Sequence, residues 1–91
     1  MVSRMLTITN PWGLHAWPAS VLAKEAMKCR SEVTMVVGDA VLNPKSILNI
    51  MAAAITQGTR IELRCDGETE KEDLEKLAFL IENDLSETGF K

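Results

Sequence analysis

The order of the predicted strands and helices is the feature of this sequence that most restricts its fold. Four short runs place apolar residues at alternate positions, and three other segments are typical of helices. These segments follow one another as β-α-β-β-α-β-α, without the regular alternation of strand and helix that builds a parallel sheet. We therefore expect a two-layer α+β domain with a mostly antiparallel sheet and its helices on one face.

Turn residues bound the predicted strands. Each strand ends at a dipeptide that favours a turn, and the second turn joins two strands into a hairpin. Cys65 alternates in phase with Ile61 and Leu63, so we expect it in the core. The strands cover residues 6–9, 32–37, 40–42 and 59–65, and they end at Asn10-Pro11, Gly38-Asp39, Asn43-Pro44 and Asp66-Gly67.

The predicted helices are recognised from apolar spacing and capping residues. The first begins at Ala16, and the second covers residues 47–55 with Ser46 as its N-cap. Thr69 and Glu72 have the spacing of a capping box, which would start the third helix. The core stripe of that helix consists of Leu74, Leu77, Ala78, Ile81 and Leu85.

Composition is that of an ordinary small folded protein. Ninety-one residues, 46% hydrophobic and 25% charged, fit a single domain over residues 1–91, with 86–91 as a frayed tail. A net charge of −3 argues against a nucleic-acid partner. The chain has no apolar stretch of membrane length and no signal-peptide pattern, so we expect a cytoplasmic protein without membrane insertion. Cys29 and Cys65 would then be reduced thiols.

The single histidine, His15, lies where a loop gives way to the first predicted helix. Pro11 and Gly13 interrupt regular structure before it, while Pro18 fits the first helical turn, whose N–H groups have no partner within the helix. Those N–H groups and the helix macrodipole favour an anion such as phosphate. The residues alone leave two interpretations open, an ordinary polar residue or a phosphate-handling one. We expect no metal site, because no cysteine or second histidine lies at ligand spacing from His15.

Three stretches resemble one known family. Gly13-Leu14-His15-Ala16-Trp17-Pro18-Ala19 resembles the active-site motif of the HPr family, the histidine-containing phosphocarriers of the phosphoenolpyruvate:sugar phosphotransferase system. Lys45-Ser46-Ile47, Thr56-Gln57-Gly58-Thr59, the chain length and the element order are also similar to that family. The resemblance implies an open-faced β-sandwich, with four antiparallel strands covered on one face by three helices.

The same resemblance implies a phosphocarrier rather than an enzyme. His15 would accept phosphate on Nδ1 from enzyme I and pass it to the A domains of enzyme II during sugar uptake. The backbone amides of Ala16 and Trp17 would stabilise the phosphate, and no cofactor would be needed.

Trp17 departs from the family pattern, which usually has arginine at this position. An indole supplies neither the charge nor the paired hydrogen bonds of a guanidinium. Trp17 is either a surface residue that shields the motif or an anchor for a partner, since tryptophan is favoured at interface centres. Lys24, two turns along the same helix, is either a solvated lysine or a partial replacement for the missing charge. We also assign Ser20 to the docking surface.

Ser46 also has two interpretations. It is explained as a helix cap, but Lys45-Ser46-Ile47 is similar to the site modified by HPr kinase/phosphorylase in Gram-positive members. A phosphate would bring about −1.5 to −2 charges beside Ile47, Leu48 and Met51, which the resemblance implies as a docking patch if exposed and as core if buried. The alternative function is a regulatory binding module that engages a transcription regulator through phosphorylated Ser46, with weak transfer at His15. We expect a monomer in either case.

Overall fold

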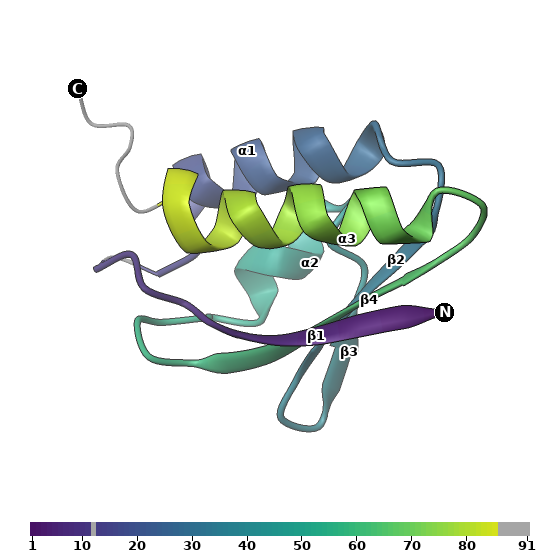
Figure 1. The fold of residues 1–91 in the computed structure, drawn as a ribbon. Coiled ribbons are helices and arrows are strands. Elements are labelled where there is room, and N and C mark those ends of the chain that lie inside the picture. Colours follow the sequence, from purple (N-terminus) through teal and green to yellow (C-terminus); the bar gives the residue numbers. More distant parts are fainter. Residues whose placement is uncertain (12, 86–91) are drawn as a thin grey trace.

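A four-stranded antiparallel sheet carries three α-helices on one face within residues 1–11 and 13–85, which this computed structural model describes. The strands are β1 (Val2–Thr7), β2 (Glu32–Val37), β3 (Ala40–Leu42) and β4 (Arg60–Asp66). The helices are α1 (Ala16–Met27), α2 (Ile47–Ala52) and α3 (Glu70–Phe79), the last continued by a π-helical turn, η1 (Leu80–Asp84). Figure 1 shows all the helices on the same side of the sheet. The predicted α+β open-faced sandwich is confirmed; the predicted tail, 86–91, lies outside the described residues.

The strands lie in the order β1-β4-β2-β3, so β4 occupies the interior of the sheet between β1 and β2. Its residues Ile61, Leu63 and Cys65 are fully buried, while the residues between them are partly exposed. This alternation places one face of β4 against the helices, as the sequence predicted. The predicted stripe on the last helix is also confirmed, because each of its members is buried: Leu74, Leu77, Ala78, Ile81 and Leu85.

Two predicted boundaries are wrong by several residues, and the fourth strand is shifted by one residue, covering Arg60–Asp66 instead of residues 59–65. The first strand covers Val2–Thr7 instead of residues 6–9, because pairing with β4 begins at Val2, opposite Cys65, and ends at Thr7. The second helix ends at Ala52, three residues before Ile55. Ala54 has a φ of 51°, a conformation that cannot continue the helix, and the chain turns there. Ile55 therefore lies in a loop, with its side chain buried.

The predicted capping box of α3 is also wrong. Thr69 is not in the extended conformation that an N-cap needs, with φ −107° and ψ 27°. Its hydroxyl instead donates to Asp73 Oδ2 at 2.7 Å. Glu70, rather than Glu72, accepts a backbone hydrogen bond before the helix, from the Gly67 N–H at 3.1 Å. The start of α3 is therefore held by carboxylates of the helix itself.

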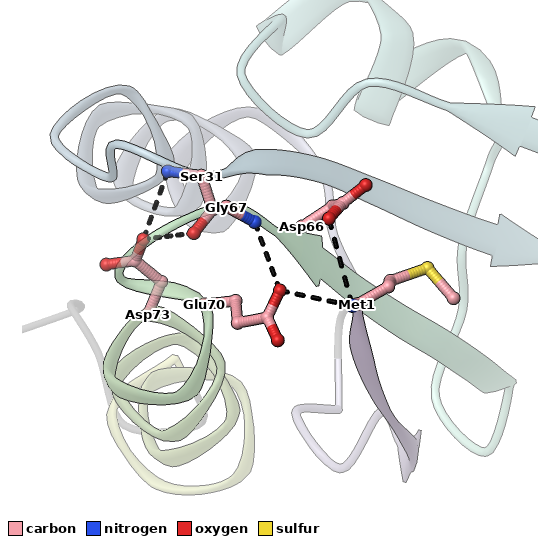
Figure 2. A network of polar contacts seen from close by, with 6 residues as sticks. All are labelled: Met1, Ser31, Asp66, Gly67, Glu70 and Asp73. Atoms are coloured by element: carbon pink, nitrogen blue, oxygen red, sulfur yellow. Dashed lines mark hydrogen bonds and ion pairs between the residues drawn. The ribbon is translucent and has the colours of Figure 1, made fainter.

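Asp73 ties α3 to the loop between α1 and β2 (Figure 2). The Ser31 N–H and hydroxyl donate to its Oδ2 at 3.1 and 2.6 Å. Burial opposes ionisation of this carboxyl, which is 9% exposed, but the bonds from Ser31 and Thr69 hold its pKa below the ordinary value. Figure 2 also shows Glu70 accepting from Gly67 and paired with the Met1 amino group at 3.2 Å. Polar contacts thus anchor α3 at the end away from His15.

Candidate functional site

A tight turn sets the path of the chain into the first helix. The Gly13 N–H donates to Asn10 O at 3.0 Å, and the buried Asn10 amide donates to Gly13 O. Gly13 has a φ of 70°, and a Cβ built there would lie 2.2 Å from Ile55 O. Only glycine fits this position without a shift of backbone, because both the conformation and the close approach exclude a side chain.

Leu14 then fastens this turn to the segment that follows α2. Its N–H donates to Ile55 O at 3.0 Å, and its side chain is buried in the core. This bond joins residues far apart in the sequence and brings the start of α1 beside the end of the α2 segment. It is the contact that places His15 relative to α2.

His15 is the N-cap residue of α1 and is exposed to solvent. Its backbone is extended, and its carbonyl accepts from the Ala19 N–H at 2.8 Å. The imidazole makes no capping hydrogen bond to the first turn. The backbone of His15 therefore starts the helix, while its ring takes no part in capping.

The first turn of α1 presents backbone donors next to His15. Ala16 and Trp17 are its first two residues, and their N–H groups have no carbonyl partner inside the helix. Pro18 follows, buried and without an N–H, in the first turn as predicted. Two adjacent amides and the positive end of the helix macrodipole thus form a suitable environment for a phosphate on the neighbouring imidazole.

The side chains assigned to docking are all exposed. Ile47 and Met51 of α2 are 41% and 42% exposed and Leu48 is 78% exposed, whereas Ile50 on the opposite side is fully buried. We call Ile47, Leu48 and Met51 the α2 patch. α1 and α2 pack against each other, and three residues of α1 that were assigned to docking are also exposed, namely Trp17, Ser20 and Lys24.

Ser46 is the N-cap of α2, as predicted. Its Oγ accepts from the Asn49 N–H at 3.2 Å, and its backbone is extended. Ser46 is partly exposed. Beside it, the Lys45 ammonium donates to Ser31 O at 2.9 Å and to Cys29 O at 3.4 Å. These two bonds hold Lys45 against the loop between α1 and β2. Lys45 directly precedes Ser46, whose hydroxyl already caps α2.

Sequence reasoning found His15 and both helix starts but missed the residues that position them. The sequence predicts Asn10 only as a turn residue after the first strand, Ile55 only as the end of the second helix, and Gly13 only as an interruption of regular structure within the motif. The Asn-Pro-Trp-Gly run was the available signal, since asparagine and glycine three residues apart are typical of a tight turn. Ile55 O carries no local signal, because a backbone carbonyl looks the same at every position.

Metal binding and membrane crossing find no support in the part of the chain that the structure covers. Among residues 1–11 and 13–85, no group of histidine, cysteine and carboxylate side chains is arranged to hold a metal ion. No helix in these ranges combines the length and the hydrophobicity needed to traverse a bilayer.

Comparison with known proteins gives consistent matches over nearly the whole chain. Residues 2–83 match the family model described as "PTS HPr component phosphorylation site". The chain is 53% identical over 60 residues to phosphocarrier protein HPr of Mycoplasma capricolum, and this match covers 66% of this chain and 67% of that protein. It is 34% identical over 85 residues to the HPr-like protein Crh of Bacillus subtilis, covering 93% and 100% of the two chains. The solved structure of HPr-C-His from Thermoanaerobacter tengcongensis superposes with a TM-score of 0.91 at 32% identity, covering 98% and 100%.

Proposed function

The chain belongs to the HPr family of phosphocarriers, and from this premise we propose that His15 accepts a phosphoryl group from phosphorylated enzyme I. The protein then passes that group to enzyme II A domains during sugar uptake in the cytoplasm. The observation that carries the proposal is the placement of the only histidine, exposed at the start of α1 with its ring not used for capping. We further propose a monomer without a cofactor, as the family resemblance implies.

The chemistry requires little from the protein beyond orientation. The Nδ1 lone pair of His15 forms a bond to phosphorus while the bond between phosphorus and the donor breaks, and the donor keeps that electron pair. The N–H groups of Ala16 and Trp17 then donate to phosphoryl oxygens, and the α1 macrodipole favours their charge. Because the phosphate stands at the surface, an acceptor approaches it directly and the same steps run in reverse.

We assign the α2 patch, Trp17, Ser20 and Lys24 to partner docking. The exposed apolar side chains of α2 give two successive partners a common surface from which water is excluded on docking. The α2 patch supplies the apolar contact and Lys24 supplies positive charge. Trp17 supplies aromatic area but not the charged hydrogen bonds that arginine would make.

The carrier role is tested by phosphoryl incorporation at His15. The protein is incubated with phosphoenolpyruvate and the enzyme I of the same genome, and its intact mass is measured before and after mild acid. We expect one acid-labile phosphoryl group, which His15→Ala abolishes and the matched variant Ser46→Ala retains. Undiminished acid-labile incorporation in His15→Ala would refute the assignment.

We also propose that Ser46 is a regulatory phosphorylation site for an HPr kinase/phosphorylase. Negative charge at the α2 N-terminus is favourable to the helix, so the fold would tolerate the phosphate. The adjoining α2 patch could then dock only by desolvating that charge. We therefore expect phosphorylated protein to melt at a similar temperature and to accept phosphate from enzyme I much more slowly.

Two observations favour a second candidate function, a regulatory binding module. Trp17 replaces a charged residue of the family motif, and the similar protein Crh is named as HPr-like rather than as a phosphocarrier. In this alternative, phosphorylated Ser46 engages a transcription regulator and transfer at His15 is weak. The two functions separate in one comparison. Transfer at His15 that slows on Ser46 phosphorylation supports the carrier, whereas absent transfer together with regulator binding by the phosphorylated form supports the module.

A further inference from the structure

The sulfur atoms of this chain divide sharply into protected and accessible ones. The sequence contains five methionines and two cysteines. Both cysteines are free and buried, and Met35 is fully buried in the sheet core. Met1, Met5, Met27 and Met51 are each more than 40% exposed. An oxidant in solution therefore meets thioethers before it meets thiols.

The cysteines are protected chemically as well as sterically. Burial raises the pKa of both thiols, that of Cys65 to about 11. The thiolate is the form that reacts with peroxides, and it is scarce at neutral pH when the pKa is raised. Cys29 and Cys65 therefore do not compete effectively for peroxide in the folded protein.

Of the exposed methionines, Met51 is the one placed in the α2 patch. Met1 precedes β1, Met5 lies within β1, and Met27 is the last residue of α1, at the opposite end of that helix from His15. Ile47 and Leu48, the other members of the patch, have side chains that peroxide does not oxidise. Oxidation at Met51 would therefore change the character of the docking surface, while oxidation at Met5 or Met27 would not.

We propose that Met51 is a site of reversible oxidation, at which conversion to methionine sulfoxide weakens partner docking on the α2 patch. The proposal rests on the docking role given to this patch above. A sulfur lone pair attacks one oxygen of hydrogen peroxide, the O–O bond breaks, and the products are the sulfoxide and water. The sulfur is oxidised by two electrons and the peroxide is reduced by two. Methionine sulfoxide reductase reverses the change.

The sulfoxide affects docking because it is a strong acceptor on an apolar surface. Ile47 and Leu48 offer it no side-chain donor, so a partner whose docking surface is apolar must remove water from the S=O group without replacing that hydrogen bond. The fold itself is spared, because the Met51 side chain is 42% exposed and the core contact of α2 is made by Ile50. We expect the rate of phosphoryl acceptance at low protein concentration to fall about tenfold, which corresponds to one lost or unmatched polar contact.

The test compares oxidised and untreated samples of the same protein. Wild type, Met51→Leu and the matched control Met27→Leu are treated with dilute hydrogen peroxide, and sulfoxides are mapped by peptide mass spectrometry. Each sample is then melted, and its rate of phosphoryl acceptance from enzyme I is divided by the rate of its own untreated portion. A further portion is treated with methionine sulfoxide reductase.

We expect slower acceptance after oxidation in wild type and in Met27→Leu, unchanged acceptance after oxidation in Met51→Leu, and recovery with the reductase. Melting temperatures should change little. A Met51 that resists oxidation, or a Met51 sulfoxide that leaves the rate ratio at one, overturns the proposal. Failure of the carrier role is distinguished from these outcomes, because the untreated wild type would then accept no phosphate at all.

Discussion

Replacement of Gly13 by alanine tests how the histidine is held in place. The new Cβ would lie 2.2 Å from Ile55 O and 2.9 Å from Thr56 Cα, and both are backbone atoms that cannot rotate aside. The residue would also keep a φ of 70°, which an L side chain rarely adopts. The Leu14 N–H to Ile55 O bond beside it would have to lengthen or break.

The size of the effect follows from these separate contributions. Left-handed strain at a non-glycine residue costs about 1–2 kcal/mol. Forced overpacking adds about 1–3 kcal/mol, and loss of a backbone hydrogen bond adds about 1 kcal/mol. The backbone shift that relieves the clash also breaks the hydrogen bond, so these two costs overlap. We therefore expect a total loss of about 3–5 kcal/mol in the free energy of unfolding.

Gly38→Ala is the matched control. Gly38 also has a positive φ, 59°, but a Cβ there meets no atom within 4 Å. It should lose only the strain contribution, about 1–2 kcal/mol. Urea denaturation of both variants gives the difference directly, and phosphoryl acceptance by the folded fraction of Gly13→Ala should fall because His15 is displaced. If Gly13→Ala loses no more stability than Gly38→Ala, the close approach to Ile55 does not hold the site.

Trp17→Arg should raise the rate of phosphoryl acceptance from a typical enzyme I roughly tenfold or more, because one charged hydrogen bond contributes about 1.5–3 kcal/mol; an unchanged rate in single-turnover kinetics would mean that the native partner is adapted to tryptophan. Asp73→Asn should cost about 1–2 kcal/mol at pH 7. The lowered pKa of Asp73 means that its contribution is present above the pKa of the unfolded chain and is lost as pH falls through the folded pKa. In urea titrations, the difference in unfolding free energy between wild type and Asp73→Asn should therefore be present at neutral pH and shrink at acid pH. The exposed control Glu72→Gln should not show this convergence. Equal losses for Asp73→Asn at both pH values would contradict the reasoning. Ser46→Ala should cost about 1 kcal/mol through loss of the α2 cap, seen as a lower thermal midpoint; no change would remove its structural role.

Predictions from the sequence succeeded where the determining contacts are local. The N-cap role of Ser46 follows from residues within three positions, and the start of α1 follows from Pro18 and the apolar spacing after it. The range of β1 failed because its partner is β4, and no short window around Val2 contains Cys65. The capping box failed because Asp73 draws the Thr69 hydroxyl away, a competition that spacing alone does not reveal.

Prediction of the candidate site shows the same contrast between local and long-range contacts. His15 and its neighbouring amides were predicted from a continuous motif. Exposure of the α2 patch was left open, since Ile47, Ile50 and Met51 are equally apolar and only the packing of α2 decides which of them faces the core. The Leu14 to Ile55 bond, which fastens the start of α1 to the segment after α2, joins two segments that are far apart in the sequence.

The position of β4 between β1 and β2 has a consequence for the newly made chain. Both neighbours are synthesised before β4, and β1 bonds to no other strand in the described sheet. On the ribosome, β1 must therefore wait unpaired until Arg60–Asp66 has emerged, with its hydrogen-bonding edges open to other chains. The sheet cannot be completed before β4 has been synthesised, so the interval in which β1 is open to other chains is set by the topology.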